Sequence, residues 1–291
     1  MLSVVILSYN RREALRRTLG ELRAQGLFDS AQIIVVDNAS SDGSPDMVRA
    51  EFPACEVLAL TTNAGVAGFN RGAERARGDM LLILDDDAWP EPDALVAALE
   101  MLRTKPATGA VALLPKHPVS QVEEWRHEKL PQSRWPVMGC GNLIRTEVWR
   151  AVGGYEEGFF LYRNDTDLAL KLLAAGFDVW FDPTWIVWHD SPGASRKSDR
   201  WLTLATRNWV WLARRHGRRF SKRIGALAGI AWAVRLAGLS PRRQWLVARG
   251  AWTGCWTRPP QVPAACHVDG KAFRDLVKRQ VGGRWRARRP V

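Results

Sequence analysis

The chain has 291 residues, of which 46% are hydrophobic and 25% charged, a composition that excludes disordered and collagen-like proteins. The length allows one large α/β domain or one domain with an appendage. Its net charge of +12 is unevenly spread, because residues 1–190 hold 19 Lys and Arg against 27 Asp and Glu, whereas residues 191–291 hold 23 against 3. The basic C-terminal part therefore points to a polyanion: an anionic membrane surface, a nucleic acid or a phosphorylated substrate.

Four cysteines stand far apart, and no C-x-x-C pair occurs among them. They are Cys55, Cys140, Cys255 and Cys266. This spacing predicts neither a zinc site nor a disulfide scaffold, and it favours a reducing cytoplasm. Residues 2–7 lack the features of a signal peptide, and the longest apolar stretch, 224–239, is short and carries Arg235. We therefore expect no transmembrane helix, and any membrane contact is expected to be peripheral.

The first half of the chain alternates apolar runs with amphipathic segments, the pattern of βαβ units in a mostly parallel sheet. Predicted strands cover 4–7, 33–36, 56–60, 80–84 and 110–114. Predicted helices cover 11–25, 68–77 and 93–102. Residues 106–136 are rich in proline and predict a crossing segment with a mobile loop around the short strand. The fold class is therefore α/β.

Regular patterns return from residue 139 onwards. We expect an apolar run at 139–144, helices from about 146 and through 167–173, a C-cap at Gly176, and two strands at 179–181 and 185–188. Beyond Ser198 the chain predicts helices rich in Arg and Trp, with apolar and basic residues on different stripes. The apolar stripe holds Trp201, Leu204, Ala205, Trp209 and Leu212, and the basic one Arg207, Arg214 and Arg218. The predicted domains are 1–195 and a basic helical extension, 196–291.

Polar residues follow three of the predicted strands, where ligands bind in open parallel sheets. These are Ser8-Tyr9-Asn10, the segment 37–44 that begins with Asp37, and Asp85-Asp86-Asp87. Each alone also fits helix caps and turns. Three adjacent carboxylates repel one another, so the triplet is costly unless a cation offsets its charge. Oxygen ligands in small number suit Mg²⁺ or Mn²⁺ that bridges substrate phosphates.

Three further segments carry candidate chemistry. Asn63 begins a glycine-rich loop, 63–72, in which Gly65 permits close backbone approach and Arg71 could reach a phosphate. Asp165 and Asp167 begin a helix after an aromatic run, where Asp165 is the better candidate for a general base and helix capping is the alternative. His189 follows a strand, as a structural residue or a metal ligand.

Together these motifs resemble the family 2 inverting glycosyltransferases of the GT-A (Rossmann-like) fold, over residues 2–195. The resemblance rests on 4–10, 35–44, 63–72, 84–87 with Pro90, Gly141-Asn142 and 159–168. It implies a donor site for the nucleotide sugar, a metal site and an acceptor side. The implied donor residues are Ser8, Tyr9, Asn10, Asp37, Asn63, Gly65, Arg71, Asp85 and Asp86. The implied metal ligands are Asp85, Asp87 and His189, and the acceptor side comprises Gly141, Asn142 and Asp167.

The resemblance also implies a mechanism. Asp165 would act as the base in a single displacement that inverts the anomeric centre, although Asn164 stands where the family usually has an acid. Processive members carry a Q-x-x-R-W signature and membrane spans, whereas Gln280 and Arg284 are one residue too far apart, so we expect a non-processive enzyme.

Residues 159–162 and the pair Arg207-Asn208 are similar to bacterial rhamnosyl- and galactofuranosyltransferases. These use UDP- or dTDP-sugars and glycan or polyprenyl-linked acceptors in cell-envelope polysaccharide synthesis. We accordingly expect a cytoplasmic enzyme, peripheral on the cytoplasmic face of the inner membrane, with Trp and Arg of the extension at the lipid interface.

Two alternatives remain open from the sequence. A sugar-phosphate nucleotidyltransferase shares a nucleotide-binding sheet and metal acids, but usually has a glycine-rich phosphate loop after the first strand, and residues 8–11 contain no glycine. A non-enzymatic polyanion-binding protein would use the basic extension. Because the acidic first 190 residues would repel a nucleic acid, none is expected as a partner.

Overall fold

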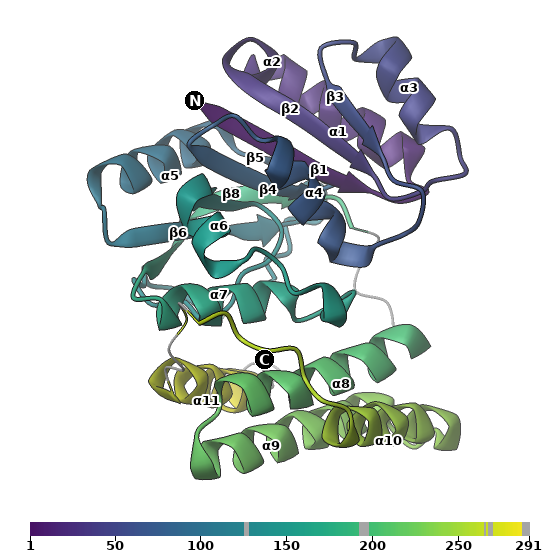
Figure 1. Ribbon diagram of the computed structural model, residues 1–291, viewed down its shortest axis with the longest axis vertical. Helices are drawn as coiled ribbons and strands as arrows, with labels where there is room; N and C mark the ends of the chain where they lie inside the picture. The colour runs from purple at the N-terminus through teal and green to yellow at the C-terminus, as the bar shows by residue number, and fades with distance from the viewer. Residues whose placement is uncertain (125–127, 192–197, 265, 267–269, 287–291) are drawn as a thin grey trace.

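A computed structural model describes residues 1–124, 128–191, 198–264, 266 and 270–286. An eight-stranded mixed sheet forms its centre, in the order β3-β2-β1-β4-β7-β6-β8-β5 (Figure 1). The strands are β1 (Leu2–Ser8), β2 (Ala31–Asp37), β3 (Glu56–Ala59), β4 (Met80–Asp85), β5 (Ala88–Pro90), β6 (Thr108–Lys116), β7 (Asn142–Arg145) and β8 (Asp178–His189). β3, β2, β1 and β4 pair in parallel, and β7 is antiparallel to β4 and β6.

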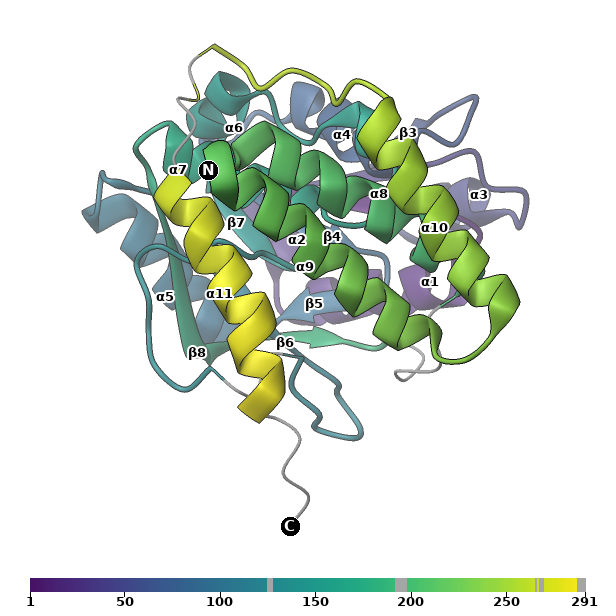
Figure 2. The ribbon, with the colours of Figure 1, turned by 90° about the horizontal axis from the view of Figure 1, so that it is seen from below.

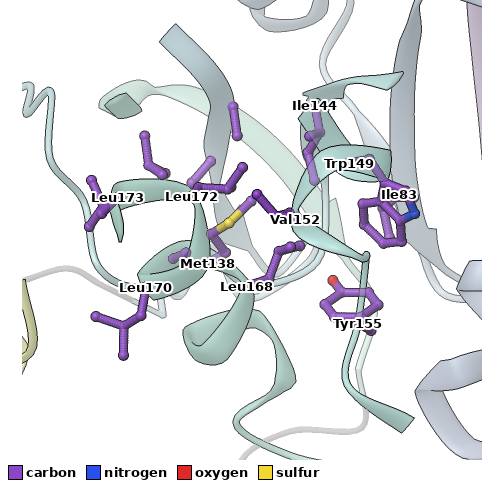
Figure 3. Packing of buried hydrophobic residues seen from close by; sticks show 14 of the residues in the cluster. Ile83, Met138, Ile144, Trp149, Val152, Tyr155, Leu168, Leu170, Leu172 and Leu173 are labelled. Carbon is purple, nitrogen blue, oxygen red and sulfur yellow. The ribbon is translucent and has the colours of Figure 1, made fainter. Parts of the chain in front are cut away.

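Helices cover both faces of this sheet, because successive strand residues point to opposite sides. The helices of the first part are α1 (Arg12–Ala24), α2 (Leu27–Ser30), α3 (Ser44–Glu51), α4 (Gly68–Arg75), α5 (Pro92–Thr104), α6 (Thr146–Val152) and α7 (Asn164–Ala174), with 3₁₀ turns η1 (Gly65–Ala67) and η2 (Glu157–Phe159). Val4 and Ile6 of β1 pack in one apolar cluster with α1, α3 and α5. Val5 packs in the other with α4, α6 and α7, and Figure 3 shows part of that cluster around Met138, Val152 and Leu168.

The basic extension forms a further helical layer beyond α7, visible from two directions in Figures 1 and 2. It consists of α8 (Asp199–His216), α9 (Arg219–Ala237), α10 (Pro241–Trp256) and α11 (Gly270–Arg286). Trp209 and Leu212 of α8 and Phe273 of α11 belong to the same apolar cluster as α7. Among the described residues, no helix combines the length and the apolar character needed to cross a bilayer.

The structure confirms the α/β class and the order of the predicted elements, with local differences. The two strands predicted at 179–181 and 185–188 are one strand, β8, whose pairing with β6 shifts register between Ala112 and Leu114. β5 and α3 were not predicted; β5 has only three residues, too few for a periodic signal, and depends on pairing with β8. α7 begins at Asn164. The predicted domain boundary after residue 195 lies outside the described residues.

Gly72 lets α4 lie directly on the sheet. A Cβ there would come within 2.3 Å of a Val5 methyl and 2.8 Å of a Val36 methyl, whereas one at Gly20 of α1 would meet nothing within 4 Å. We expect Gly72→Ala to lower the free energy of unfolding by roughly 1–3 kcal/mol through overpacking. Gly20→Ala should raise it by about 0.5–1 kcal/mol, because alanine costs less entropy in a helix. Urea denaturation of both variants measures the contrast, and equal effects would contradict this packing.

Candidate active site

Three strand ends meet at one edge of the sheet, as the sequence predicted. Ser8 of β1 lies opposite Asp37 of β2 in the register, and Leu7 lies opposite Asp85 of β4. Asp85 is partly buried, while the next two acids, Asp86 and Asp87, are 4% and 2% exposed. The chain thus carries an acidic cluster into the protein interior at this edge, where its charge must be offset.

Part of that offset comes from Arg11, which the sequence analysis did not single out. Its guanidinium lies 3.2 Å from Asp86 and 2.8 Å from Asp87. The backbone N–H of Tyr9 donates to Asp86 at 3.4 Å, and the hydroxyl of Thr18 donates to the Asp86 carbonyl at 2.9 Å. Asp86 is therefore held by contacts within the protein itself.

The three acids differ in their protonation. Burial raises the pKa of Asp85 to about 6, with a further contribution from the charge of Asp87. Burial also raises the pKa of Asp86 to about 7, against the charge of Arg11. For Asp87, burial acts in the same direction, but the hydrogen bond and charge of His189 together with Arg11 outweigh it and hold the pKa below its usual value. Asp87 is thus the acid of the triplet that stays ionised most firmly.

His189 connects the triplet to a second set of side chains. Its Nε2 lies 3.4 Å from Asp87, and its Nδ1 lies 2.8 Å from a carboxylate oxygen of Glu124. Burial would lower the pKa of His189, but Cys140, Asp87 and Glu124 raise it. One ligand atom each from Asp85, Cys140 and His189 lie within 4.8 Å of one another. These residues have the donor types and the spacing of a divalent-metal site.

Asp165 shares a small cavity with Asp85. This cavity of about 50 Å³ is lined by Val66, Phe69, Ile83, Asp85, Gly139, Cys140, Tyr155 and Asp165. The buried Tyr155 hydroxyl donates to Asp165 at 2.6 Å, and Figure 3 shows Tyr155 near Ile83 at the margin of the apolar cluster. Burial raises the pKa of Asp165 to about 7, and the hydrogen bond from Tyr155 partly opposes this shift. A carboxyl with such a pKa can take up a proton near neutral pH.

The residues predicted for the nucleotide surround the ends of β1 and β2. Asp37 is buried; one carboxylate oxygen accepts from the Ser40 N–H at 3.0 Å, and the other has no hydrogen-bond partner within the described part of the chain. Asn10 has a positive φ of 53°, and its side chain accepts from the Ser41 N–H at 2.7 Å. Tyr9 is 44% exposed. These positions suit a base and a ribose at the surface.

The glycine-rich loop lies beside them. The Asn63 side chain accepts from the Gly65 N–H at 2.8 Å, and a Cβ at Gly65 would approach the Phe160 carbonyl oxygen to 2.2 Å. Arg71 instead pairs with Glu74 at 3.0 Å and Glu157 at 3.3 Å. Its guanidinium is thus held by two acids rather than presented to the cavity.

The residues predicted for the acceptor side do not all lie at the same place. Gly141 has a φ of +73°, and a Cβ there would meet Val187 at 2.7 Å; Asn142 is buried at the start of β7, with its amide donating to the Gly139 carbonyl. Asp167 is 0% exposed and points toward α8, where Arg215 lies 2.9 Å and His216 Nε2 lies 2.8 Å from the same oxygen. The structure therefore places Asp167 in a buried ion cluster outside the cavity.

Four residues of this site escaped the sequence analysis: Arg11, Glu124, Cys140 and Tyr155. Arg11 directly follows the first strand-end motif, and Cys140 precedes Gly141-Asn142, so proximity in sequence was an available signal for these two. Glu124 and Tyr155 reach the site only through chain folding, 65 residues from His189 and 10 residues from Asp165 respectively.

Comparison with known proteins identifies the family of this chain. Residues 3–168 match the model of the family described as glycosyl transferase family 2, and the chain belongs to that family. It is 23% identical over 262 residues to an N-acetylglucosaminyl-diphospho-decaprenol L-rhamnosyltransferase of Mycobacterium tuberculosis, covering 74% of this chain and 85% of that protein. The chain is thus a glycosyltransferase, which sets aside a nucleotidyltransferase and a non-enzymatic polyanion-binding protein.

Solved structures support the GT-A fold. A mannosyltransferase from Pyrobaculum calidifontis in complex with GDP-Man and Mn²⁺ has a TM-score of 0.59 at 22% identity, covering 98% of this chain and 85% of that one. GalNAc-T7 with UDP, GalNAc and Mn²⁺ has a TM-score of 0.64 at 15% identity, covering 97% of this chain and 57% of that one. At these identities the likeness establishes the fold alone.

We expect Asp167 to stabilise the folded state. Burial would raise its pKa, but the hydrogen bond and charge of His216, with the charges of Arg215 and Lys171, hold it below its usual value. Asp167→Asn leaves buried cations without their counter-charge, so we expect a loss of about 3–5 kcal/mol in the free energy of unfolding. Asp46→Asn, at an exposed pair with Arg49, is the control and should change it little. Chemical denaturation measures both, and equal stability would refute the assignment.

Proposed function

We propose that this glycosyltransferase is metal-dependent, inverting and non-processive. It moves a sugar from a UDP- or dTDP-sugar to a hydroxyl of a glycan or lipid-linked acceptor in bacterial cell-envelope polysaccharide synthesis. The observation that carries the proposal is the shared cavity: Asp165, a carboxyl with a pKa of about 7, lines the same small space as Asp85 of the acidic triplet. One space thus holds a candidate base and the edge of a candidate diphosphate site.

Asp165 serves as the base in a single displacement. Its ionised form takes the proton of the acceptor hydroxyl as that oxygen attacks the anomeric carbon, and the bond to the nucleotide diphosphate breaks on the opposite side. Tyr155 holds one Asp165 oxygen by its hydroxyl at 2.6 Å, which fixes the carboxylate and leaves the other oxygen for the acceptor. Inversion follows from the single step, since no covalent enzyme intermediate intervenes.

The metal site is proposed at Asp85, Asp87 and His189. The donor set fits Mn²⁺ or Mg²⁺, because two carboxylates and an imidazole supply few ligands and leave positions for phosphate oxygens. Glu124 is placed to accept from Nδ1–H of His189, which would orient Nε2 toward Asp87. A bound ion would take the place of the Nε2 proton that the raised pKa of His189 favours. A bound divalent ion would supply charge stabilisation for the departing nucleotide diphosphate. Cys140 lies within the same spacing and adds a softer potential ligand.

The donor nucleotide is assigned to the ends of β1 and β2. The buried Asp37 has a carboxylate oxygen with no hydrogen-bond partner among the described residues, which suits an N–H of a base or a ribose hydroxyl. Ser8, Tyr9 and Asn10 line the same edge, next to the Asn63–Gly65 turn. Uridine and thymidine remain the proposed bases. The name of the related N-acetylglucosaminyl-diphospho-decaprenol L-rhamnosyltransferase supports the lipid-linked acceptor of the proposal.

The first test removes the two central carboxyls separately. We expect wild-type protein to release nucleotide diphosphate from one member of a panel of UDP- and dTDP-sugars with acceptor and Mn²⁺. Asp165→Asn should keep donor affinity while the transfer rate falls at least about 100-fold, because the base is lost. Asp87→Ala should abolish the response to Mn²⁺. Unchanged turnover in Asp87→Ala would exclude metal-assisted transfer, and lost donor binding in Asp165→Asn would move that residue into the nucleotide site.

The extension is proposed to hold the enzyme at the cytoplasmic face of the inner membrane. Trp245, Trp252 and Trp256 of α10 are 59%, 66% and 72% exposed, and their spacing puts them on one helix face. Two arginines of the same helix lie nearby: Arg249 stacks on Trp245, and Arg242, which pairs with Asp199 at 2.9 Å, has an 81% exposed side chain. Tryptophan with arginine suits the interface of an anionic bilayer, where a polyprenyl-linked acceptor would be found.

This attachment is testable with lipid vesicles. We expect the protein to sediment with vesicles containing phosphatidylglycerol and much less with pure phosphatidylcholine, because arginines need anionic lipid. Replacing Trp245, Trp252 and Trp256 by serine should reduce binding several-fold. The matched control replaces the exposed Val96 and Val119, which lie on the first part of the chain, and should leave binding intact. Equal sedimentation of both variants would contradict the proposed face.

A further inference from the structure

The segment directly before Asp165 is held in an unfavourable backbone conformation. Phe160, Tyr162 and Arg163 all have positive φ, at 63°, 69° and 68°, although none is glycine. Around Phe160 the Leu161 N–H donates to the Phe159 carbonyl at 2.8 Å, which closes a tight γ-turn. Non-glycine residues adopt such conformations only where surrounding contacts impose them. The contacts that impose this backbone conformation therefore also determine where α7 begins and where Asp165 lies.

Those contacts come from α8. The Asn208 amide, 0% exposed, shares its two N–H groups among the carbonyls of Phe159 at 3.0 Å, Leu161 at 2.8 Å and Tyr162 at 2.8 Å. Arg207 donates from Nε to the Asn208 side-chain oxygen at 2.9 Å, which orients the amide. Its Nη2 donates to the Gly158 and Phe159 carbonyls at 3.0 and 2.9 Å. Two adjacent side chains of one helix thus donate to four of the five backbone carbonyls from Gly158 to Tyr162, all except that of Phe160.

The Phe160 carbonyl instead bonds to the glycine-rich loop of the proposed donor-sugar site. It accepts from the Val66 N–H at 2.8 Å, next to Gly65, where any Cβ would collide with the same carbonyl. The turn therefore touches the glycine-rich loop on one side and α8 on the other. Because the turn cannot relax without losing both sets of hydrogen bonds, the base and the donor loop are fixed relative to each other.

A second set of contacts with α8, an ion cluster, fixes the start of α7. Asp167, two residues after the base, is bound by Arg215 and His216 of the same helix α8, and Arg215 also lies 3.2 Å from Glu156 before the turn. α8 thus binds the chain on both sides of Asp165, and the Asp165 carboxylate remains in the cavity. This helix lies after residue 168, where the match to the family model ends.

We propose that Asn208 is a positioning residue of the transfer reaction and that α8 completes the active site by holding the 158–163 turn. The inference rests on the proposed function, because it assigns Asn208 an effect through Asp165. Asn208 contacts neither the cavity nor the acids of the triplet. It acts on the transition state indirectly, by orienting the Asp165 carboxylate. Loss of its hydrogen bonds should slow transfer while leaving the donor site intact.

Asn208→Asp tests this with the smallest change of shape. The carboxylate keeps the partner Arg207 but has no N–H to donate, and it faces three carbonyl oxygens. We expect kcat to fall about 100-fold, since a misplacement of the order of 1 Å costs that much, with KM for the donor within about threefold of wild type. The control is Arg214→Ala, on the same helix, whose guanidinium donates to the carbonyls of Gly254 and Thr257 in and after α10. It should leave kcat unchanged.

Hydrogen exchange supplies a readout that does not depend on turnover. In Asn208→Asp, the peptide covering residues 158–163 should exchange faster than in wild type, while peptides from β1 and β4 keep their protection. Unchanged exchange with unchanged kcat would overturn the inference. A wild-type protein that transfers no sugar from any donor would instead refute the proposed function, and the exchange result would still decide whether Asn208 holds the turn. Uniformly faster exchange would show general unfolding and also count against positioning.

Discussion

The burial of Asp86 and Asp87 at the end of β4 is the constraint on which the rest of the site depends. Carboxylates enter a protein interior only with partners, because the charged form loses its hydration there. Arg11 on one side and His189 on the other supply those partners at 2.8 to 3.4 Å. To bring them there, β1 must lie beside β4, and β8 must end near Asp87, where the Asp190 N–H donates to the Asp87 carbonyl at 2.8 Å.

This arrangement explains why the three acids of the cluster have different surroundings. Asp86 and Asp87 contact Arg11, while Asp85 is partly buried and lines the cavity with Asp165. An acidic triplet therefore does not by itself require a metal, since protein cations already offset part of its charge. The stronger argument for a divalent ion is geometric, because Asp85, Cys140 and His189 converge from β4, the segment before β7, and β8.

The C-terminal helices do more than cover the first part of the chain. From the sequence they were a basic extension with its arginines on a separate stripe, and Trp and Arg were expected at a lipid interface. In the structure these basic residues have separate tasks: Arg207 binds the turn before Asp165, Arg214 binds the end of α10, and Arg215 pairs with the buried Asp167. Net charge cannot distinguish these tasks, because it counts cations without their partners.

The sequence by itself determined the α/β class, the strands with continuous apolar runs and the family resemblance, because buried parallel strands and their polar ends leave strong local patterns. It also determined that Asp37 and Asp85 would lie at the same edge, since parallel strands end together. Only the tertiary structure decided that Asp165 enters the cavity while Asp167, two residues on, faces away into α8. A helix turns about 200° in two residues, so the choice between them depends on how α7 is oriented. That orientation is set by Asn208, Arg215 and His216, whose contacts span more than 45 residues and leave no periodic trace in the sequence.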